Sequence, residues 1–312
     1  MSTINSTLLT NVTPVISAVQ PKWTPFLTGQ AVVLGLSLFS NILVLIEFLR
    51  IPSRITPFTV YLIVLLLSNL LFLSVVPLTE LSNQLYGRWW MGRAVCYLHN
   101  YFNGVGSGSQ ICIHVSISIN RLWAVHYPIS YKNNHNKKVA LLTCLSAVIF
   151  AHVIGLPGCI MDIMYYGIDL KYGCHINYLA QVLWGKFENA LLHILPLVLI
   201  IGAYVHLCIN RVRRRRKIRE SGSGKVSAGT STEDGGKRKE AVRPFLVLSL
   251  TAVSVTVCWT PAVVYFAVIK FAGLWMPEWF FILSVMFYSM QALFDPWLFA
   301  VALLATNRKW CS

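Results

Sequence analysis

Seven long apolar spans run through this chain, and they constrain its fold more than any other feature. They lie near residues 26–49, 57–82, 94–126, 138–161, 180–210, 243–271 and 277–304. A helix needs roughly 20 apolar residues to cross the ~30 Å hydrocarbon layer of a bilayer, and each span is long enough. The sequence therefore predicts an all-α membrane protein, a seven-transmembrane helix bundle over residues 26–304.

The third span is also free of charge along most of its length. Between Cys96 and Arg121 there is no Lys, Arg, Asp or Glu. As a helix this stretch would measure roughly 37 Å, which places the cysteine at one membrane face and the arginine at the other. Arginine is common at the ends of membrane helices, so Arg121 alone indicates no function.

Composition and charge support the membrane class and a single orientation. The chain is 56% hydrophobic and 12% charged, whereas a soluble domain carries about 25% charged residues. A formal charge of +15 would suit nucleic acid, but roughly 20 of the 26 Lys and Arg fall on alternate connections that share one side. We expect the N-terminus outside, the C-terminus inside and no nucleic acid partner.

The segments outside the bundle follow this orientation. Residues 1–25 form a polar tail with glycosylation sequons at Asn5 and Asn11, so we expect an extracellular glycosylated tail. Residues 211–242 begin with a basic cluster that suits anionic lipid and continue as a Gly- and Ser-rich stretch, which predicts a flexible third intracellular loop. Residues 305–312 form a short cytoplasmic tail in which Cys311 is a palmitoylation candidate.

Several other function classes lack their signatures. No C-x-x-C pair or histidine grouping suggests a metal site, and no nucleophile–base pair or phosphate loop suggests an enzyme. The last span has no lysine for a retinal Schiff base. A transporter usually shows repeated halves, and no such symmetry is visible.

A set of residues, one or more in nearly every span, carries a family resemblance. The set consists of Asn41, Trp90, Cys96, Asn120-Arg121-Leu122, Tyr127-Pro128, Cys174, Pro196, Tyr204, Cys258-Trp259-Thr260-Pro261 and Asp295-Pro296 with Phe299. With these residues in this order, the chain resembles a rhodopsin-like (class A) G-protein-coupled receptor over nearly its whole length. The stretch after Arg121 is similar to that of amine receptors, in which Trp-Ala also follows the arginine.

The resemblance implies roles for these residues. Cys96 and Cys174 both fall on the oxidising side, where a disulfide would tie the loop after the fourth span to the third. Four residues are expected to couple to the G protein: Asn120, Arg121, Leu122 and Tyr204. Five are expected to form the activation switch: Trp259, Pro261, Asp295, Pro296 and Phe299.

Two departures from the family involve carboxylates. The family's acid before the arginine is Asn120 here, and its usual acid in the sixth span aligns near Ala241. A weakened inactive-state clamp on Arg121 would raise basal signalling, although such ion pairs contribute anything from almost nothing to several kcal/mol. Asn120, Leu122 and Phe299 also suit a receptor-like protein that signals weakly.

The second departure exchanges an acid and an amide between two spans. Asn69 stands where the family has Asp in the second span, and Asp295 stands where it has Asn in the seventh. A mid-membrane carboxylate is costly without a partner, so we expect a polar network of Asn41, Asn69 and Asp295. It either holds Na+ or ordered water, or serves as a structural clamp between helices.

The expected ligand pocket lies in the outer third of the bundle. Its candidate residues are Asn103, Ser107, Glu80, Glu188, Trp259, Phe266 and Ser289, with Tyr265 as a further wall residue. Asn103 replaces the amine-binding aspartate, so monoamine binding in the usual form is not expected. Glu188 either meets a cationic or hydroxyl-bearing ligand or pairs with Lys186.

The sequence thus predicts a multi-pass plasma-membrane receptor rather than an enzyme. It would bind a small molecule or short peptide and activate heterotrimeric G proteins through an outward movement of the sixth span. The alternatives are a receptor-like protein with weak or no G-protein signalling and a transporter-like membrane protein.

Overall fold

The computed structural model describes residues 20–50, 52, 55–167, 174, 180–222, 233–267 and 277–307. Within these ranges all regular structure is helical. The predicted glycosylation sites Asn5 and Asn11 and the palmitoylation candidate Cys311 lie outside the described residues.

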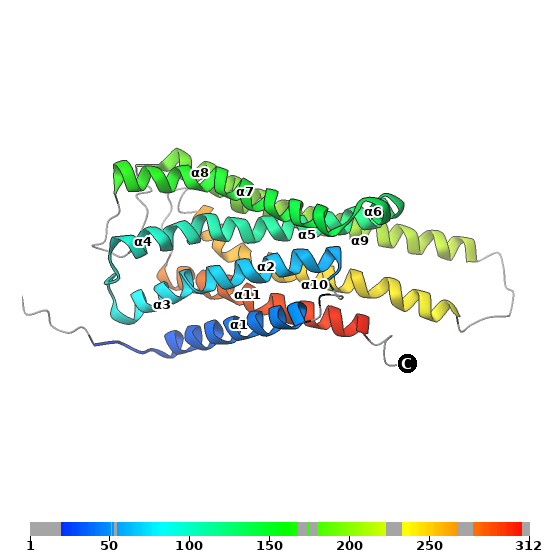
Figure 1. Ribbon diagram of the computed structural model, residues 1–312, viewed down its shortest axis with the longest axis horizontal. Coiled ribbons are helices and arrows are strands. Elements are labelled where there is room, and N and C mark those ends of the chain that lie inside the picture. The colour runs from blue at the N-terminus through cyan, green and yellow to red at the C-terminus, as the bar shows by residue number, and fades with distance from the viewer. Residues whose placement is uncertain are drawn as a thin grey trace, which may run out of the picture.

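The described helices form an elongated bundle in which their axes run roughly side by side (Figure 1). They are α1 (Pro25–Arg50), α2 (Pro57–Leu73), α3 (Val76–Tyr86), α4 (Gly92–Tyr101), α5 (Ser107–His126), α6 (Pro128–Asn134), α7 (Lys137–Met161), α8 (Val182–Asn189), α9 (Leu195–Gly222), α10 (Glu233–Ala267) and α11 (Glu278–Asn307). Three π-helical turns, η2 (Phe102–Gly106), η3 (Asp162–Tyr166) and η4 (Ala190–Ile194), continue α4 into α5, extend α7 and join α8 to α9. In the described part, each of the seven predicted spans therefore corresponds to a helical rod.

The surface of the bundle is apolar where lipid would lie. Helix α1 exposes Leu36 and Phe39, and α7 exposes Leu142 and Val153, each more than half accessible. Exposing these apolar side chains to water costs free energy, and contact with lipid hydrocarbon avoids that cost. The outer faces of α1 and α7 are therefore consistent with a bilayer around the bundle.

Five helical segments of the described chain are long and apolar enough to cross a membrane. They are Pro25–Arg50, Pro57–Tyr86, Lys137–Tyr166, Val182–Arg213 and Ser249–Phe266. The third predicted span is not among them because α5 carries buried polar residues such as Gln110, His114 and Asn120. These side chains face the bundle interior, so they lower the mean hydropathy of the helix without exposing polar groups to lipid.

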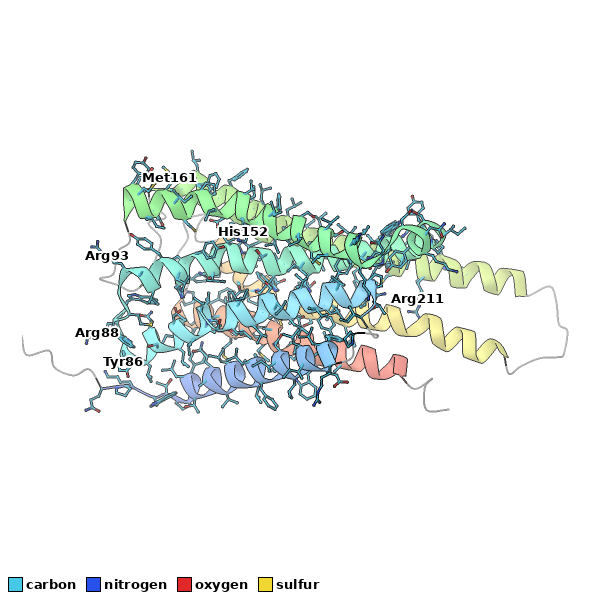
Figure 2. The ribbon with its side chains drawn as sticks, viewed as in Figure 1. Tyr86, Arg88, Arg93, His152, Met161 and Arg211 are labelled. Carbon is cyan, nitrogen blue, oxygen red and sulfur yellow. A yellow bond between two sulfur atoms is a disulfide. The ribbon has the colours of Figure 1, made fainter. Side chains whose placement is uncertain are left out.

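The two ends of the bundle differ. The start of α1 lies at the end that carries α3 and α4, whereas α6 and the end of α11 lie at the opposite end (Figure 1). Arg88 and Arg93 lie at the first end and Arg211 near the second (Figure 2). Charged groups thus sit where a bilayer would meet water. The assignment of the first end to the outside stays a prediction.

Local sequence signals explain where several helices start. Thr56 caps α2 by accepting from the Thr59 backbone N–H at 3.2 Å, ahead of Pro57 in the first turn. Asn136 caps α7 by accepting from the Val139 N–H at 3.0 Å. Helix α2 ends at Leu73 and α3 restarts at Val76, so Pro77 lies in a first turn, where its missing N–H costs little.

Helices extend into both ends of the predicted flexible loop over residues 211–242. Helix α9 continues to Gly222 and α10 begins at Glu233, and the flexibility of the loop stays a prediction. Arg, Lys and Glu are good helix formers, and their charges require no partner helix in water. The remaining residues 223–232 lie outside the described residues.

Candidate functional site

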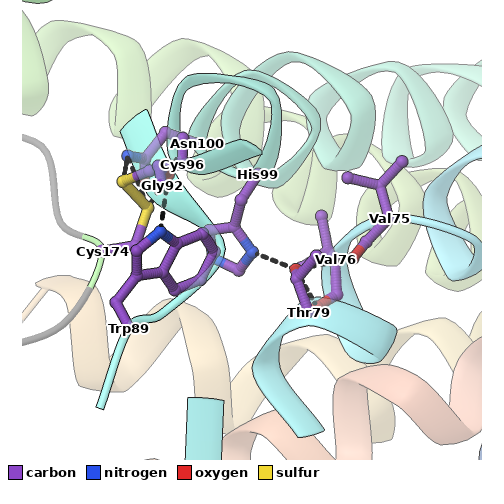
Figure 3. Close-up of a disulfide and its surroundings, with 9 residues drawn as sticks. All are labelled: Val75, Val76, Thr79, Trp89, Gly92, Cys96, His99, Asn100 and Cys174. Atoms are coloured by element: carbon purple, nitrogen blue, oxygen red, sulfur yellow. Dashed lines mark hydrogen bonds between the residues drawn. A yellow bond between two sulfur atoms is a disulfide. The ribbon is translucent and has the colours of Figure 1, made fainter. Parts of the chain in front are cut away.

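A disulfide joins α4 to the segment that follows α7. Cys96 and Cys174 are bonded across a sequence separation of 78 residues, with their Cα atoms 5.5 Å apart, which confirms the predicted pair (Figure 3). Trp89 packs against the disulfide, and its Nε1 donates to the Gly92 carbonyl oxygen at 2.8 Å. His99 Nδ1 lies 2.7 Å from Thr79 Oγ1, which links α4 to α3. The end of the bundle that carries α3 and α4 is thus tied covalently and by hydrogen bonds.

Trp90, one of the residues that carry the family resemblance, is not the tryptophan that packs on the disulfide. Its side chain is 56% exposed and its Nε1 donates to Ser82 Oγ at 3.0 Å. Trp89 is 7% exposed and makes the contact with the disulfide. Two adjacent tryptophans cannot be told apart by composition, because only the direction of the chain at Gly87 to Gly92 decides which one points inward.

A cavity lies between the helices next to this disulfide. Its open space measures about 1260 Å³, including solvent at its mouth. All seven residues predicted for the pocket line it: Asn103, Ser107, Glu80, Glu188, Trp259, Phe266 and Ser289. Tyr265 is not among the lining residues; its ring lies 5.4 Å from that of Phe266 and 6.3 Å from that of Phe280. These seven residues, from five different rods, thus meet at one concave surface.

The π-helical turn η2 shapes one wall of the cavity. It contains Asn103 and Gly104, and π-bulges are frequent at functional sites. A methyl group at Gly104 would lie 2.8 Å from Glu188 Oε1, and one at Gly155 would lie 3.3 Å from the same oxygen. The two glycines therefore make room for the Glu188 carboxylate between η2 and α7. Gly108 does the same for Leu192, whose Cδ1 would lie 2.9 Å from an added methyl.

The floor of the cavity is aromatic and carries buried donors. Trp259 is 2% exposed and meets Tyr288 edge to face at 4.6 Å between ring centroids. His193 lies 6.0 Å from Trp259. Among the described residues, Trp259 Nε1 and Asn189 Nδ2 have no hydrogen-bond partner. Buried donors of this kind require an acceptor from a bound molecule or water.

Several polar residues that were not predicted from the sequence also line the cavity: His99, Asn100, His193, Ser284 and Tyr288. His193 follows Asn189 by four residues, so a helical reading of the fifth span places both on one face. The others carry no comparable signal in the sequence.

The core polar network forms below the cavity. Asn69 Nδ2 donates to Asp295 Oδ2 at 3.2 Å and to Asn41 Oδ1 at 3.3 Å, so the three predicted members meet. Asn41 Nδ2 also donates to the Ala292 carbonyl oxygen at 2.7 Å, which joins α1 to α11. Asp295 is fully buried.

Three further residues, which were not predicted from the sequence, complete the network. Gln110 Nε2 donates to Asn69 Oδ1 at 2.9 Å, and Gln291 Nε2 donates to Asp295 Oδ1 at 2.6 Å. His114 Nε2 lies 3.3 Å from Asp295 Oδ2. The polar residues at four-residue spacing in the third span, 110 and 114, were the available signal.

At the opposite end of the bundle, Arg121 meets an aromatic ring. Its guanidinium carbon lies 3.5 Å from the centroid of Phe58 on α2. Such cation–π contacts contribute about 0.5–2 kcal/mol. Among the described side chains no ion pair to Arg121 is found, in line with the loss of both carboxylates noted in the sequence.

Asn120 connects α5 to α2 and α6. Its Nδ2 donates to Tyr61 Oη at 3.3 Å and lies 2.7 Å from His135 Nε2, and its Oδ1 accepts from Tyr131 Oη at 3.2 Å. Burial first, and then the positive charge of Arg121, lowers the pKa of His135 below its ordinary value. The neutral ring can accept from the Asn120 amide, so this cluster favours uncharged His135.

The remaining predicted coupling and switch residues lie on α5, α9, α10 and α11. Tyr204 packs against the hydrophobic cluster that contains Cys258 and Trp259. Leu122 contributes its carbonyl oxygen, 2.9 Å from His126 Nδ1. Phe299 is 1% exposed and packs in a separate cluster with Tyr61 and Ile117. Pro261 and Pro296 lie within α10 and α11.

Comparison with known families decides what kind of protein this is. The family described as 7 transmembrane receptor (rhodopsin family) matches residues 40–299. The chain belongs to this family. It is therefore a membrane receptor of the rhodopsin family rather than an enzyme, and the family implies a seven-helix bundle.

Individual relatives of this rhodopsin-family receptor match only in part. Probable G-protein coupled receptor 19 from Homo sapiens is 30% identical over 38% of this chain and 28% of its own length. Alpha-2B adrenergic receptor from Cavia porcellus is 23% identical over 69% of this chain and 48% of its own length. Type-1 angiotensin II receptor B from Rattus norvegicus is 24% identical over 57% of this chain and 51% of its own length. The matches thus cover about half or less of these relatives.

The His135 cluster of this rhodopsin-family receptor predicts a pH dependence. Protonating His135 replaces the acceptor at Nε2 with a donor that faces the Asn120 amide. Because the folded-state pKa is lowered, the contribution of His135 to stability is full above its unfolded value of about 6.5 and is lost as the pH falls below it. We expect the melting temperature to fall more steeply for wild type than for His135→Gln between about pH 7.5 and about pH 5.5.

The measurement is thermal unfolding of the purified receptor in buffers of equal ionic strength. His152→Gln, on α7 and far from Asn120 in the chain, is the control for a histidine elsewhere and should keep the wild-type slope. Equal slopes for wild type and His135→Gln would contradict the prediction.

Proposed function

We propose that this chain is a G-protein-coupled receptor of the plasma membrane that binds an extracellular ligand in the outer cavity and activates heterotrimeric G proteins. The observation that carries the proposal is the convergence of the seven pocket residues on one cavity between the helices. Ligand sites are commonly concave, mostly apolar and lined by a few placed polar groups, and this cavity has that character. The relatives whose names include G-protein coupled or adrenergic receptor support the coupling.

The polar groups of the cavity indicate the chemistry of the ligand. Glu80 and Glu188 supply carboxylates, whereas Asn103 offers an amide that cannot form an ion pair. Trp259 Nε1 and Asn189 Nδ2 supply donors that lack a partner among the described residues. We therefore expect a small molecule or short peptide with a cationic or hydroxyl group for Glu188 and an acceptor oxygen for the floor.

The mechanism is a shift between two populations of the bundle. A ligand that binds more tightly when α10 has swung outward around Pro261 favours that state, and only this difference in affinity drives the change. Pro261 lacks an N–H and so weakens the helical hydrogen-bond ladder at that point. The opening exposes Arg121 and Tyr204 to the G protein. Since Asn120 is no carboxylate, we also propose raised basal signalling.

A panel of amines, amino alcohols and short peptides tests the ligand assignment. G-protein subunit dissociation is measured in cells for each Gα class, with receptor shown at the surface. We expect a member of the panel to activate one Gα class. Glu188→Gln should weaken the potency of that ligand by about tenfold or more, which corresponds to about 1.4 kcal/mol of binding free energy. Unchanged potency in Glu188→Gln would remove Glu188 from the ligand site.

Gly104→Ala tests the geometry of the Glu188 site without changing a charge. The added methyl would come within 2.8 Å of Glu188 Oε1, so the carboxylate has to move. We expect a loss in ligand potency of about three- to tenfold and a small drop in melting temperature, because such overpacking costs about 1–3 kcal/mol when it is not relieved. Gly35→Ala is the matched control, since nothing lies within 4 Å of its added methyl. Equal effects of the two substitutions would contradict the prediction.

A further inference from the structure

The core of the bundle holds a buried acid beside a buried base, and the base was not predicted from the sequence. Asp295 on α11 is 0% exposed and His114 on α5 is 2% exposed. His114 Nε2 lies 3.3 Å from Asp295 Oδ2, within ion-pair distance. A carboxylate buried at this depth is costly unless a positive charge or a proton accompanies it.

The oxygens of the network are already occupied by N–H donors. Asp295 Oδ1 accepts from Gln291, and Asp295 Oδ2 accepts from Asn69 and faces His114. Asn69 Oδ1 accepts from Gln110, and Asn41 Oδ1 accepts from Asn69. Hard cations are bound by the lone pairs of several oxygens. Here each of these four oxygens points at a donor hydrogen, so the residues do not fit Na+.

The pair can instead be made neutral by one proton. An ionised Asp295 beside a neutral His114 leaves a net negative charge in the membrane interior. One added proton, carried by the imidazole or by the carboxyl group, cancels that charge without any oxygen ligand. We propose that the His114–Asp295 pair is a proton-binding site that takes the place of a sodium site in the core of this receptor.

Few other titratable groups of the described residues surround the pair. The Cys258 thiol on α10 faces Asp295, and Tyr204 on α9 packs against the hydrophobic cluster that contains Cys258. From α1, α2 and α11 the neighbours are the amides of Asn41, Asn69 and Gln291, which do not titrate. The proton is therefore assigned to His114 and Asp295 together.

The first test compares sodium with a cation too large for the core. The purified full-length receptor is melted in sodium chloride and in choline chloride at equal ionic strength and neutral pH. We expect the wild-type melting temperature to be the same in both salts. A wild-type melting temperature that rises with sodium, and loses this rise in Asp295→Asn, would overturn the proposal. The readout does not depend on ligand or G protein, so its failure is distinct from failure of the proposed function.

The second test removes the base. His114→Leu leaves Asp295 without its proton partner, so we expect a melting temperature about 5–10 °C lower in choline, because removing one partner of a buried pair is strongly destabilising. The loss should be the same in sodium chloride, because Gln291, Asn69 and Gln110 still donate to the oxygens of the network. His114→Gln, which keeps a polar side chain but takes up no proton, should also melt lower than wild type by the same amount in both salts. His152→Leu on α7, a partly buried histidine, is the control and should melt closer to wild type. A His114→Leu receptor as stable as wild type in both salts would overturn the proposal.

The third measurement compares the pH dependence of the wild type with that of Asp295→Asn. A rise in pH that removes the proton leaves the buried charge of Asp295 uncompensated. We expect the wild-type melting temperature to fall more steeply than that of Asp295→Asn as the pH is raised above neutrality, equally in both salts. Equal pH dependence of the two proteins would overturn the proposal.

Discussion

Replacing Cys174 with serine is expected to lower the free energy of unfolding by about 2–5 kcal/mol and to deplete the receptor from the cell surface. The bond closes a loop of 78 residues, and long loops lose the most conformational freedom in the unfolded chain when they are cross-linked. The bonded cysteines are 0% and 4% exposed and pack with Trp89, so a serine hydroxyl there would also lack the contacts of the sulfur.

The stability of the double cysteine variant, compared with that of each single variant, is the decisive measurement. Cys96→Ser and Cys174→Ser break the same bond, so the double variant should be no less stable than either single one. Cys208→Ser, a free and only partly buried cysteine, is the control and should change stability by less than about 0.5 kcal/mol. Additive losses at Cys96 and Cys174, or a wild-type melting temperature for either, would contradict the prediction.

Arg121→Ala is expected to reduce G-protein activation by about tenfold or more, to the level of cells without receptor, at matched surface expression. The residue lies at the end of the bundle opposite to the cavity, next to Asn120, and its guanidinium stacks on Phe58. Removing the guanidinium removes the group that we assign to the G-protein contact. Arg93→Ala, an exposed arginine at the other end of the bundle (Figure 2), is the control and should signal as wild type.

Phe58→Leu separates the contact that holds Arg121 from the contact that Arg121 makes with the G protein. Losing a cation–π interaction of about 0.5–2 kcal/mol would raise the population in which Arg121 has left the Phe58 site by about two- to thirtyfold. Basal activation should therefore rise in Phe58→Leu and fall in Arg121→Ala, measured with subunit-dissociation sensors for each Gα class. If wild type, Arg121→Ala and Phe58→Leu all match an empty-vector control with and without ligand, the chain is a receptor-like protein that does not signal.

Much of the cavity could be predicted because helical spacing decides which side chains share a face. Ser107 follows Asn103 by four residues, and both line the cavity as that spacing predicts. His99 and Tyr288 were not predicted because their positions depend on where α3, α4 and α11 meet. Tyr265 does not line the cavity, because its ring turns towards Phe280. Such details depend on helix rotation and on the π-helical turns, which the apolar pattern does not encode.

The sequence by itself determined the class of the fold, the number of membrane spans and the disulfide pair. These follow from the length of the apolar runs and from the placement of charge and cysteine along the chain, which are local properties. Only the tertiary structure decided that Trp89 rather than Trp90 meets the disulfide, that Phe58 receives Arg121, and that His114 pairs with Asp295. Each of these contacts joins residues whose relative positions depend on how the helices are packed and rotated, and no local pattern carries that information.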